Sequence, residues 1–128
     1  MENINHPKHY NQQPIECITV TSQLNFNLGN AVKYLWRYSD KNGKEDLLKA
    51  KWYLNRQHNH NDPMPQISVQ KESSLLNDLC DCSFNANQHD AISAIVQAAA
   101  NWHDAPVISS EFLSAANHAL IRLLNGEE

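Results

Sequence analysis

The sequence predicts an all-α protein made of an N-terminal loop, a helical hairpin, a proline-containing linker and about three further helices. Three observations lead to this prediction. Apolar residues recur at helical spacing, acidic residues stand in the first turns of two predicted helices, and the 128 residues include only three glycines. So few glycines argue against a glycine-rich nucleotide-binding fold and against a loop-dominated β sandwich.

The first predicted helix follows a loop at residues 2–13 and covers residues 14–24. Pro14 suits its first turn, because the N–H that proline lacks has no helical partner at that position. The β-branched run at residues 18–21 leaves a strand open as an alternative.

Two longer predicted helices form the hairpin. The first covers residues 27–39 and should stop near Asn42-Gly43, a pair that tolerates the left-handed cap conformation. The second covers residues 44–58, with two acidic residues in its first turn, where the helix dipole favours anions. The apolar residues expected to form the core of the hairpin are Leu28, Val32, Leu35, Trp36, Leu47, Ala50 and Leu54.

The clearest break in the chain lies at residues 59–70, where Pro63 and Pro65 forbid a continuing helix. Residues 1–60 carry eight Lys or Arg against five Asp or Glu, a net of +3, and residues 61–128 carry two against nine, a net of −7. Cleavage in the linker should leave a helical N-terminal fragment, unless the two parts share one core. The predicted parts are a helical module (1–59), a linker (60–70) and an acidic helical segment (71–128).

Three helices are predicted after the linker. The first covers residues 72–80. The second opens at Asn87, with Asp90 three residues on in a box-like cap, and Pro106 ends it. Ser109 caps the third helix, which continues close to the end of the chain.

The composition excludes several classes of protein. No run approaches the roughly 18 apolar residues of a membrane span, and the polar start of the chain does not resemble a signal peptide. The three cysteines, Cys17, Cys80 and Cys82, indicate reduced thiols in a cytoplasm, with Cys80 as a small buried hydrophobe. The sequence contains no Walker loop and no G-x-S-x-G elbow.

The polar pattern that most strongly suggests a binding site lies on the first helix of the hairpin. Asn30, Lys33 and Arg37 recur beside its apolar stripe, where an Arg fork and a Lys point charge can hold a phosphate or a carboxylate. The alternative is a solvated face with i,i+4 pairs such as Glu45 with Lys49. A net of +3 is low for duplex binding, so direct nucleic-acid binding is not expected. The aromatic residues expected to pack the hairpin, with base stacking as the alternative, are Trp36, Trp52 and Tyr53.

The histidines and cysteines do not follow the spacing of a zinc finger, because the C-x-C of Cys80 and Cys82 cannot form the usual knuckle. Two His-Asp dipeptides, at residues 89–90 and 103–104, resemble those of metal-dependent phosphohydrolases, but the further ligands are not evident. We therefore expect no metal site and interpret these residues as surface or capping groups.

Four blocks stand in order in the N-terminal half: HPKHY at 6–10, PIECI at 14–18, GNAVKYLWR at 29–37 and EDLLKAKWYL at 45–54. Over about residues 6–57 this order resembles a family of small bacteriophage and prophage proteins of unknown function. A related domain forms the C-terminal half of a phage nucleotide kinase that lacks a Walker loop. The resemblance implies a phage or prophage origin and residence in the cytoplasm of the bacterial host.

The kinase resemblance implies a nucleotide pocket, with Mg²⁺ as the cofactor of a kinase activity. Lys33 and Arg37 would neutralise phosphates, and Glu16 would meet a base, a sugar or the metal. The long N-terminal half of that kinase has no counterpart in this sequence, which carries an acidic helical segment instead and puts catalysis in doubt. The residues carried over to the pocket are His9, Tyr10, Glu16, Asn30, Lys33 and Arg37.

The leading hypothesis is a non-enzymatic phage accessory protein without a cofactor. It would bind or inhibit a host or phage protein complex, such as a host defence system, in the manner of anti-CRISPR proteins. An acidic helical surface would dock onto a basic nucleic-acid channel, or serve solubility alone. The alternatives are a nucleotide-binding protein or nucleoside monophosphate kinase that uses the N-terminal module, and a structural role with self-association. The residues expected on the docking surface are Asp78, Asp81, Asp90, Asp104 and Glu111.

Overall fold

The computed structural model describes residues 13–128, which form six α-helices and no strand, so the predicted all-α class is confirmed. The strand alternative at residues 18–21 is wrong, because these residues are helical. None of the helices in this part of the chain is long and apolar enough to cross a membrane. The helices are α1 (Cys17–Thr21), α2 (Phe26–Arg37), α3 (Lys44–His60), α4 (Val69–Cys80), α5 (Ala86–Asn101) and α6 (Pro106–Leu124).

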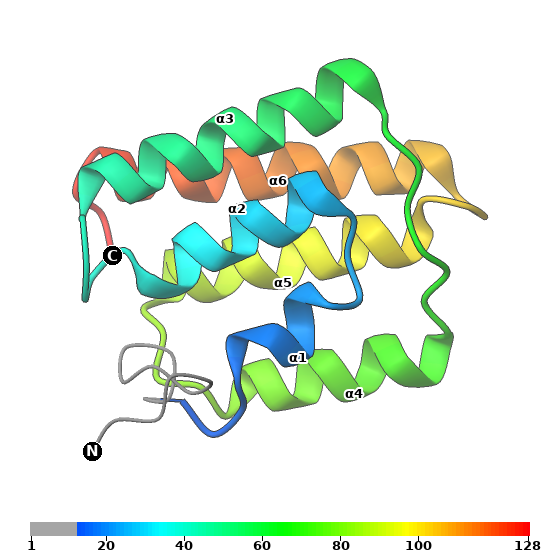
Figure 1. Cartoon of the computed structure of the whole chain (residues 1–128), viewed down its shortest axis with the longest axis horizontal. Coiled ribbons are helices and arrows are strands. Elements are labelled where there is room, and N and C mark those ends of the chain that lie inside the picture. Colours follow the sequence, from blue (N-terminus) through cyan, green and yellow to red (C-terminus); the bar gives the residue numbers. More distant parts are fainter. Residues whose placement is uncertain (1–12) are drawn as a thin grey trace.

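The helices are arranged in two layers (Figure 1). Antiparallel α2 and α3 form the predicted hairpin in the front layer, and the α5–α6 pair lies behind them. Helix α4 packs along α5 at one edge, and the short α1 packs on α2. Contacts of α2 with α5 and of α3 with α6 join the two layers.

One hydrophobic core lies between the layers. Its buried side chains come from all six helices and from the linker, where Met64 and Ile67 are buried. Trp36 of α2 packs edge-to-face against Phe84 of the α4–α5 loop, with ring centroids 4.9 Å apart. The interior of the hairpin is therefore part of the same core as the C-terminal helices.

Several helix boundaries in the N-terminal half differ from the prediction. Helix α1 ends at Thr21 rather than at residue 24, and α3 continues to His60 rather than to residue 58. Helix α1 begins at Cys17 rather than at residue 14, because Glu16 is extended, with φ −82° and ψ 146°. Helix α2 ends at Arg37, and Gly43 adopts φ +53° immediately before α3. Asn42-Gly43 therefore leads into the second helix of the hairpin and does not cap the first.

The start of α5 also differs from the prediction. Asn85 is the N-cap and forms a capping box with Gln88, whereas the sequence placed this box at Asn87 and Asp90. The Asn85 Nδ2 donates a hydrogen bond to the Tyr38 hydroxyl at 2.6 Å. This tertiary contact ties the cap to the end of α2 and favours Asn85 over Asn87.

Pro106 begins a helix rather than ending one. Helix α5 stops at Asn101, and Pro106 occupies the first turn of α6, where its missing N–H costs no hydrogen bond. Ser109 was predicted as the cap but lies inside α6. Its Oγ donates a hydrogen bond to the Ala98 carbonyl of α5 at 2.6 Å, so it joins two helices in the core.

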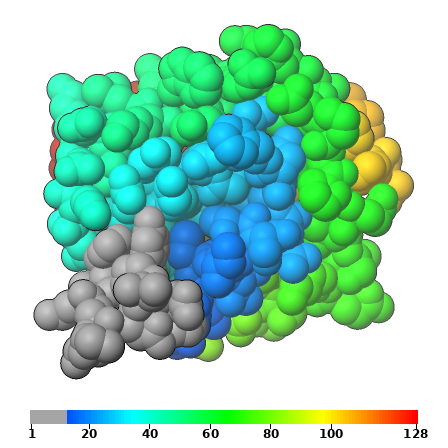
Figure 2. All heavy atoms as spheres, in the orientation of Figure 1, coloured from blue at the N-terminus to red at the C-terminus, as the bar shows by residue number. Residues whose placement is uncertain are grey.

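The linker is held in place by buried amide side chains. Gln57 Oε1 accepts hydrogen bonds from Asn25 Nδ2 at 2.7 Å and from Asn27 Nδ2 at 3.0 Å. Gln57 Nε2 donates to the Asp62 carbonyl at 2.9 Å, and Asn27 Nδ2 also donates to the Asp62 carboxylate at 2.8 Å. Residues 61–68 follow one edge of the α2–α3 face (Figure 2), as a fixed part of the fold.

Candidate functional site

Four aromatic rings of α2 and α3 gather on the solvent side of the hairpin. Tyr34 and Tyr53 are stacked, with ring centroids 6.1 Å apart. Tyr53 also makes edge contacts to Phe26 at 5.8 Å and to Trp52 at 5.0 Å. Phe26 is 73% exposed and Trp52 is 57% exposed. The exposed Phe26 and Trp52 thus form one contiguous aromatic group with the partly buried Tyr34 and Tyr53.

Three cations converge on the Tyr34 ring. Lys33 Nζ lies 4.6 Å, Arg37 Cζ 4.9 Å and Lys49 Nζ 5.4 Å from its centroid. Lys49 also forms the predicted i,i+4 pair with Glu45 at 3.5 Å, but both side chains are well exposed and such pairs are weak. We define the aromatic–cation face as Phe26, Lys33, Tyr34, Arg37, Lys49, Trp52 and Tyr53.

Two hollows open on the aromatic–cation face. The larger has a volume of about 300 Å³ and is lined by Tyr34, Lys49, Trp52 and Tyr53. The smaller, of about 240 Å³, is lined by the α1–α2 turn and by α2 residues that include Phe26, Asn30 and Lys33. Among the described residues, neither lining contains a carboxylate, an imidazole or a thiol. The hollows therefore offer ring surface, amide groups and positive charge.

Arg37 has a second partner, Asp46 of α3, whose side chain is fully buried. The Arg37 Nε lies 3.3 Å from Asp46 Oδ2, and its Nη2 donates to Oδ1 at 3.4 Å. The backbone N–H of Asn42 donates to Oδ2 at 3.3 Å. Because Asp46 already balances the charge of Arg37, Lys33 and Lys49 are the better placed cations for a new anion.

The structure brings together part of the set carried over from the kinase resemblance. Lys33 and Arg37 contact the same ring, and Asn30 lines the smaller hollow beside Lys33. The Asn30 Nδ2 donates to a carbonyl of its own helix at 2.9 Å. His9 and Tyr10 lie outside the described residues.

The start of α1 lies near the cations of α2. Glu16 is the residue that precedes the helix, and Cys17 follows it with a buried side chain. Burial raises the pKa of the Cys17 thiol to about 12, against the opposite effect of the Lys33 and Arg37 charges. Glu16 is therefore next in sequence to Cys17, whose thiol interacts electrostatically with both Lys33 and Arg37.

The prediction that the tryptophans pack the hairpin is confirmed for Trp36, which lies in the core, and is wrong for Trp52. Trp36 is buried against the α4–α5 loop, and Trp52 is exposed on the outer side of α3.

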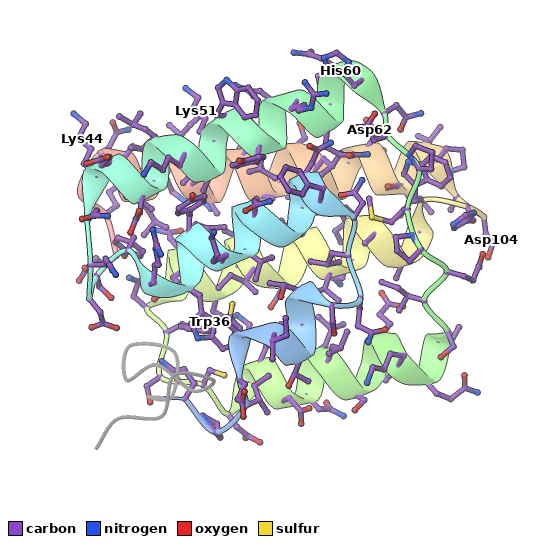
Figure 3. The ribbon with its side chains drawn as sticks, in the orientation of Figure 1. Trp36, Lys44, Lys51, His60, Asp62 and Asp104 are labelled. Carbon is purple, nitrogen blue, oxygen red and sulfur yellow. The ribbon has the colours of Figure 1, made fainter. Side chains whose placement is uncertain are left out.

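Lys44 and Lys51 project from α3 away from α2 (Figure 3), so they are separate from the aromatic–cation face. Phe26 was missed, because a single ring at a helix start carries no periodic signal.

The acidic residues of the predicted docking surface lie toward two ends of the molecule. Asp78 and Asp81 stand at the C-terminal end of α4, and Asp90 lies in the first half of α5. Asp104 lies at the opposite end (Figure 3), and Glu111 is in the first turns of α6. We define Asp78, Asp81 and Asp90 as the acidic corner.

Cys80 is exposed at the end of α4, so its prediction as a buried side chain is wrong. Leu75 and Leu79 occupy the core side of α4, which turns the next residue toward solvent. Among residues 13–128, no three His, Cys, Asp or Glu side chains are placed to hold a metal ion.

Comparison with known proteins gives one partial match. Residues 4–55 match the model of a family described as proteins of unknown function, DUF3310. The match covers less than half of the chain, but it contains every residue of the aromatic–cation face. No curated protein and no solved structure matches the chain.

Proposed function

We propose that the protein is a non-enzymatic nucleotide-binding protein of phage or prophage origin, with its ligand on the aromatic–cation face. The convergence of three cations on Tyr34, beside exposed rings, supports this proposal most strongly. A nucleotide presents a flat base and an anionic phosphate, which match ring surface and positive charge. The rings, amides and ammonium groups of the two described linings hold a nucleotide by stacking, hydrogen bonding and charge, and we therefore propose binding rather than catalysis.

In this proposal the aromatic rings hold the base of the nucleotide and the lysines hold its phosphate. Its base stacks on Trp52 or Tyr53 in the larger hollow, where the rings are accessible. Its phosphate lies between Lys49 and Lys33, which approach the same ring from different helices. The exposed Lys49–Glu45 pair opens at little cost when the phosphate binds.

Lysine substitutions test this placement. Lys33→Ala and Lys49→Ala should each weaken binding of nucleoside monophosphates about tenfold, because each removes one charged contact to phosphate. The measurement is isothermal titration calorimetry with the monophosphates of all four bases. Arg37→Ala is a poor test, since it also leaves the buried Asp46 without its partner.

The matched controls are Lys44→Ala and Lys51→Ala, which change the net charge equally but lie away from the face (Figure 3). These variants should bind as the unchanged protein does. Equal losses in all four variants would contradict a defined site and indicate a general charge effect.

A second candidate function is docking of the acidic corner onto a basic, nucleic-acid-binding channel of a host complex, as in an anti-defence protein. One observation favours it. Asp78 and Asp81 stand at the C-terminal end of α4, whose last turn has no basic residue, although the helix dipole disfavours anions there. Acidic residues kept at an unfavourable position suggest a role other than stability.

Charge reversal tests this second candidate. A variant with Asp78→Lys, Asp81→Lys and Asp90→Lys should lose its partners in affinity capture from host lysate. The captured proteins should bind nucleic acid, and added duplex DNA should compete with their capture. The control variant, Asp104→Lys with Glu111→Lys, should retain them. Retention by both variants would count against the acidic corner as a docking site.

A further inference from the structure

A groove of about 450 Å³ between α4, α5 and α6 holds a thiol beside an imidazole. Cys80 Sγ lies 4.0 Å from His89 Nε2, and Ser93 Oγ lies 3.3 Å from the same nitrogen. Asp90 Oδ1 lies 3.6 Å from the other ring nitrogen, Nδ1. All four side chains line the groove, together with Arg122 of α6.

A thiol next to an imidazole, which is in turn next to a carboxylate, is the arrangement of an activated cysteine nucleophile. The carboxylate of Asp90 favours a proton on His89 Nδ1. The lone pair of Nε2, which Ser93 Oγ also contacts, can then accept the proton of the Cys80 thiol. The thiolate that results is the reactive form of cysteine. Separations of this size are common in ligand-free sites and shorten when a substrate binds.

The other two cysteines lack this setting. Burial raises the pKa of Cys17 to about 12. Burial, followed by the charges of Asp78 and Asp81, raises the pKa of Cys82 to about 11. Both thiols therefore stay protonated at neutral pH, and of the three cysteines only Cys80 is exposed.

We propose that Cys80 is the nucleophile of a thiol–disulfide exchange with a low-molecular-weight disulfide bound in this groove. His89 Nε2 takes the thiol proton, and the Cys80 sulfur attacks one sulfur of the disulfide. A bond forms between the two sulfurs, the disulfide bond breaks, and the second sulfur leaves as a thiolate that receives the proton from His89. Cys80 is oxidised to a mixed disulfide, and the substrate is reduced to one free thiol.

The lining of the groove indicates which disulfide fits. Leu76, Phe112 and Ala115 provide apolar surface, and Asp90 and Arg122 provide opposite charges. Asp78 and Asp81 add negative charge at the end of α4. A disulfide that carries both an ammonium and a carboxylate, as an amino-acid disulfide does, suits this setting better than a dianion.

The test follows the reaction of the whole chain with neutral 4,4′-dithiodipyridine by absorbance. One thiol should react rapidly at pH 7; Cys80→Ser should remove this phase and Cys82→Ser should leave it. His89→Ala should slow the phase about tenfold at pH 7 but only slightly at pH 9.5, where hydroxide replaces the imidazole as the base. His89→Gln should behave as His89→Ala does. A rate at pH 7 that neither His89 variant changes would show an ordinary exposed thiol and overturn the proposal.

Substrate class is tested with cystine, a zwitterion, and dithiodiglycolate, a dianion, by mass spectrometry of the mixed disulfide. Cystine should react faster, and Arg122→Gln should reduce this preference. Equal rates for the two disulfides would overturn the assignment of the groove as their binding site.

Discussion

A fragment of residues 1–59 should not fold by itself, although it contains the whole helical hairpin. Its core side chains belong to the same cluster as those of α5 and α6, and in the intact chain α2 contacts α5 while α3 contacts α6. About sixty residues seldom bury enough apolar surface to offset the loss of conformational entropy. Circular dichroism should therefore show little helix and no cooperative thermal transition for this fragment.

The control is the full chain with a protease site placed at the exposed Pro65-Gln66 in the linker. After cleavage the two pieces should remain associated and unfold together, because the shared core holds them. A cooperative transition of the isolated fragment would contradict a single core and support two independent parts.

Asp46→Ala should lower the free energy of unfolding by about 3 kcal/mol, since it removes a fully buried carboxylate that is paired with the largely buried Arg37. The substitution also removes an acceptor from the Asn42 N–H. The measurement is urea unfolding followed by circular dichroism, compared with the unchanged protein.

Glu45→Ala is the matched control for this substitution. Glu45 is in the same first turn of α3, so both variants lose one anion near the helix start. Its pair with Lys49 is exposed, and its loss should change stability by less than about 1 kcal/mol. Equal losses in the two variants would indicate a dipole effect rather than a buried ion pair.

Periodicity predicted the hairpin because apolar spacing determines which side of each helix is buried. Leu28, Val32 and Leu35 are all buried, as the stripe on this helix indicated. Asp46 was expected in the first turn together with Glu45, and its burial was missed. The signal was present, since Asp46 precedes the buried Ala50 and Leu54 by four and eight residues.

Helix ends were less predictable, because they depend on tertiary contacts. Pro106 fits both the end of one helix and the start of the next, and packing decides between them. Asn85 and Asn87 are equivalent as caps in sequence, but only Asn85 reaches the Tyr38 hydroxyl. Boundaries of this kind follow from the assembled core and not from local spacing.

The candidate site was predicted only in part. Lys33 and Arg37 were identified on one helix, but Lys49 reaches the same ring from the other, which requires the register of the hairpin. The Cys80–His89 contact depends on how α4 and α5 pack, since nine residues separate the two side chains in sequence.

The central claim is that the aromatic–cation face binds nucleotides, and an NMR titration of the ¹⁵N-labelled protein with a nucleoside monophosphate tests it most directly. Amide shifts should concentrate on α2 and α3 around Lys33, Tyr34, Lys49 and Tyr53, while α5 and α6 remain unchanged. The absence of shifts at millimolar nucleotide, or shifts confined to α4–α6, would contradict the claim.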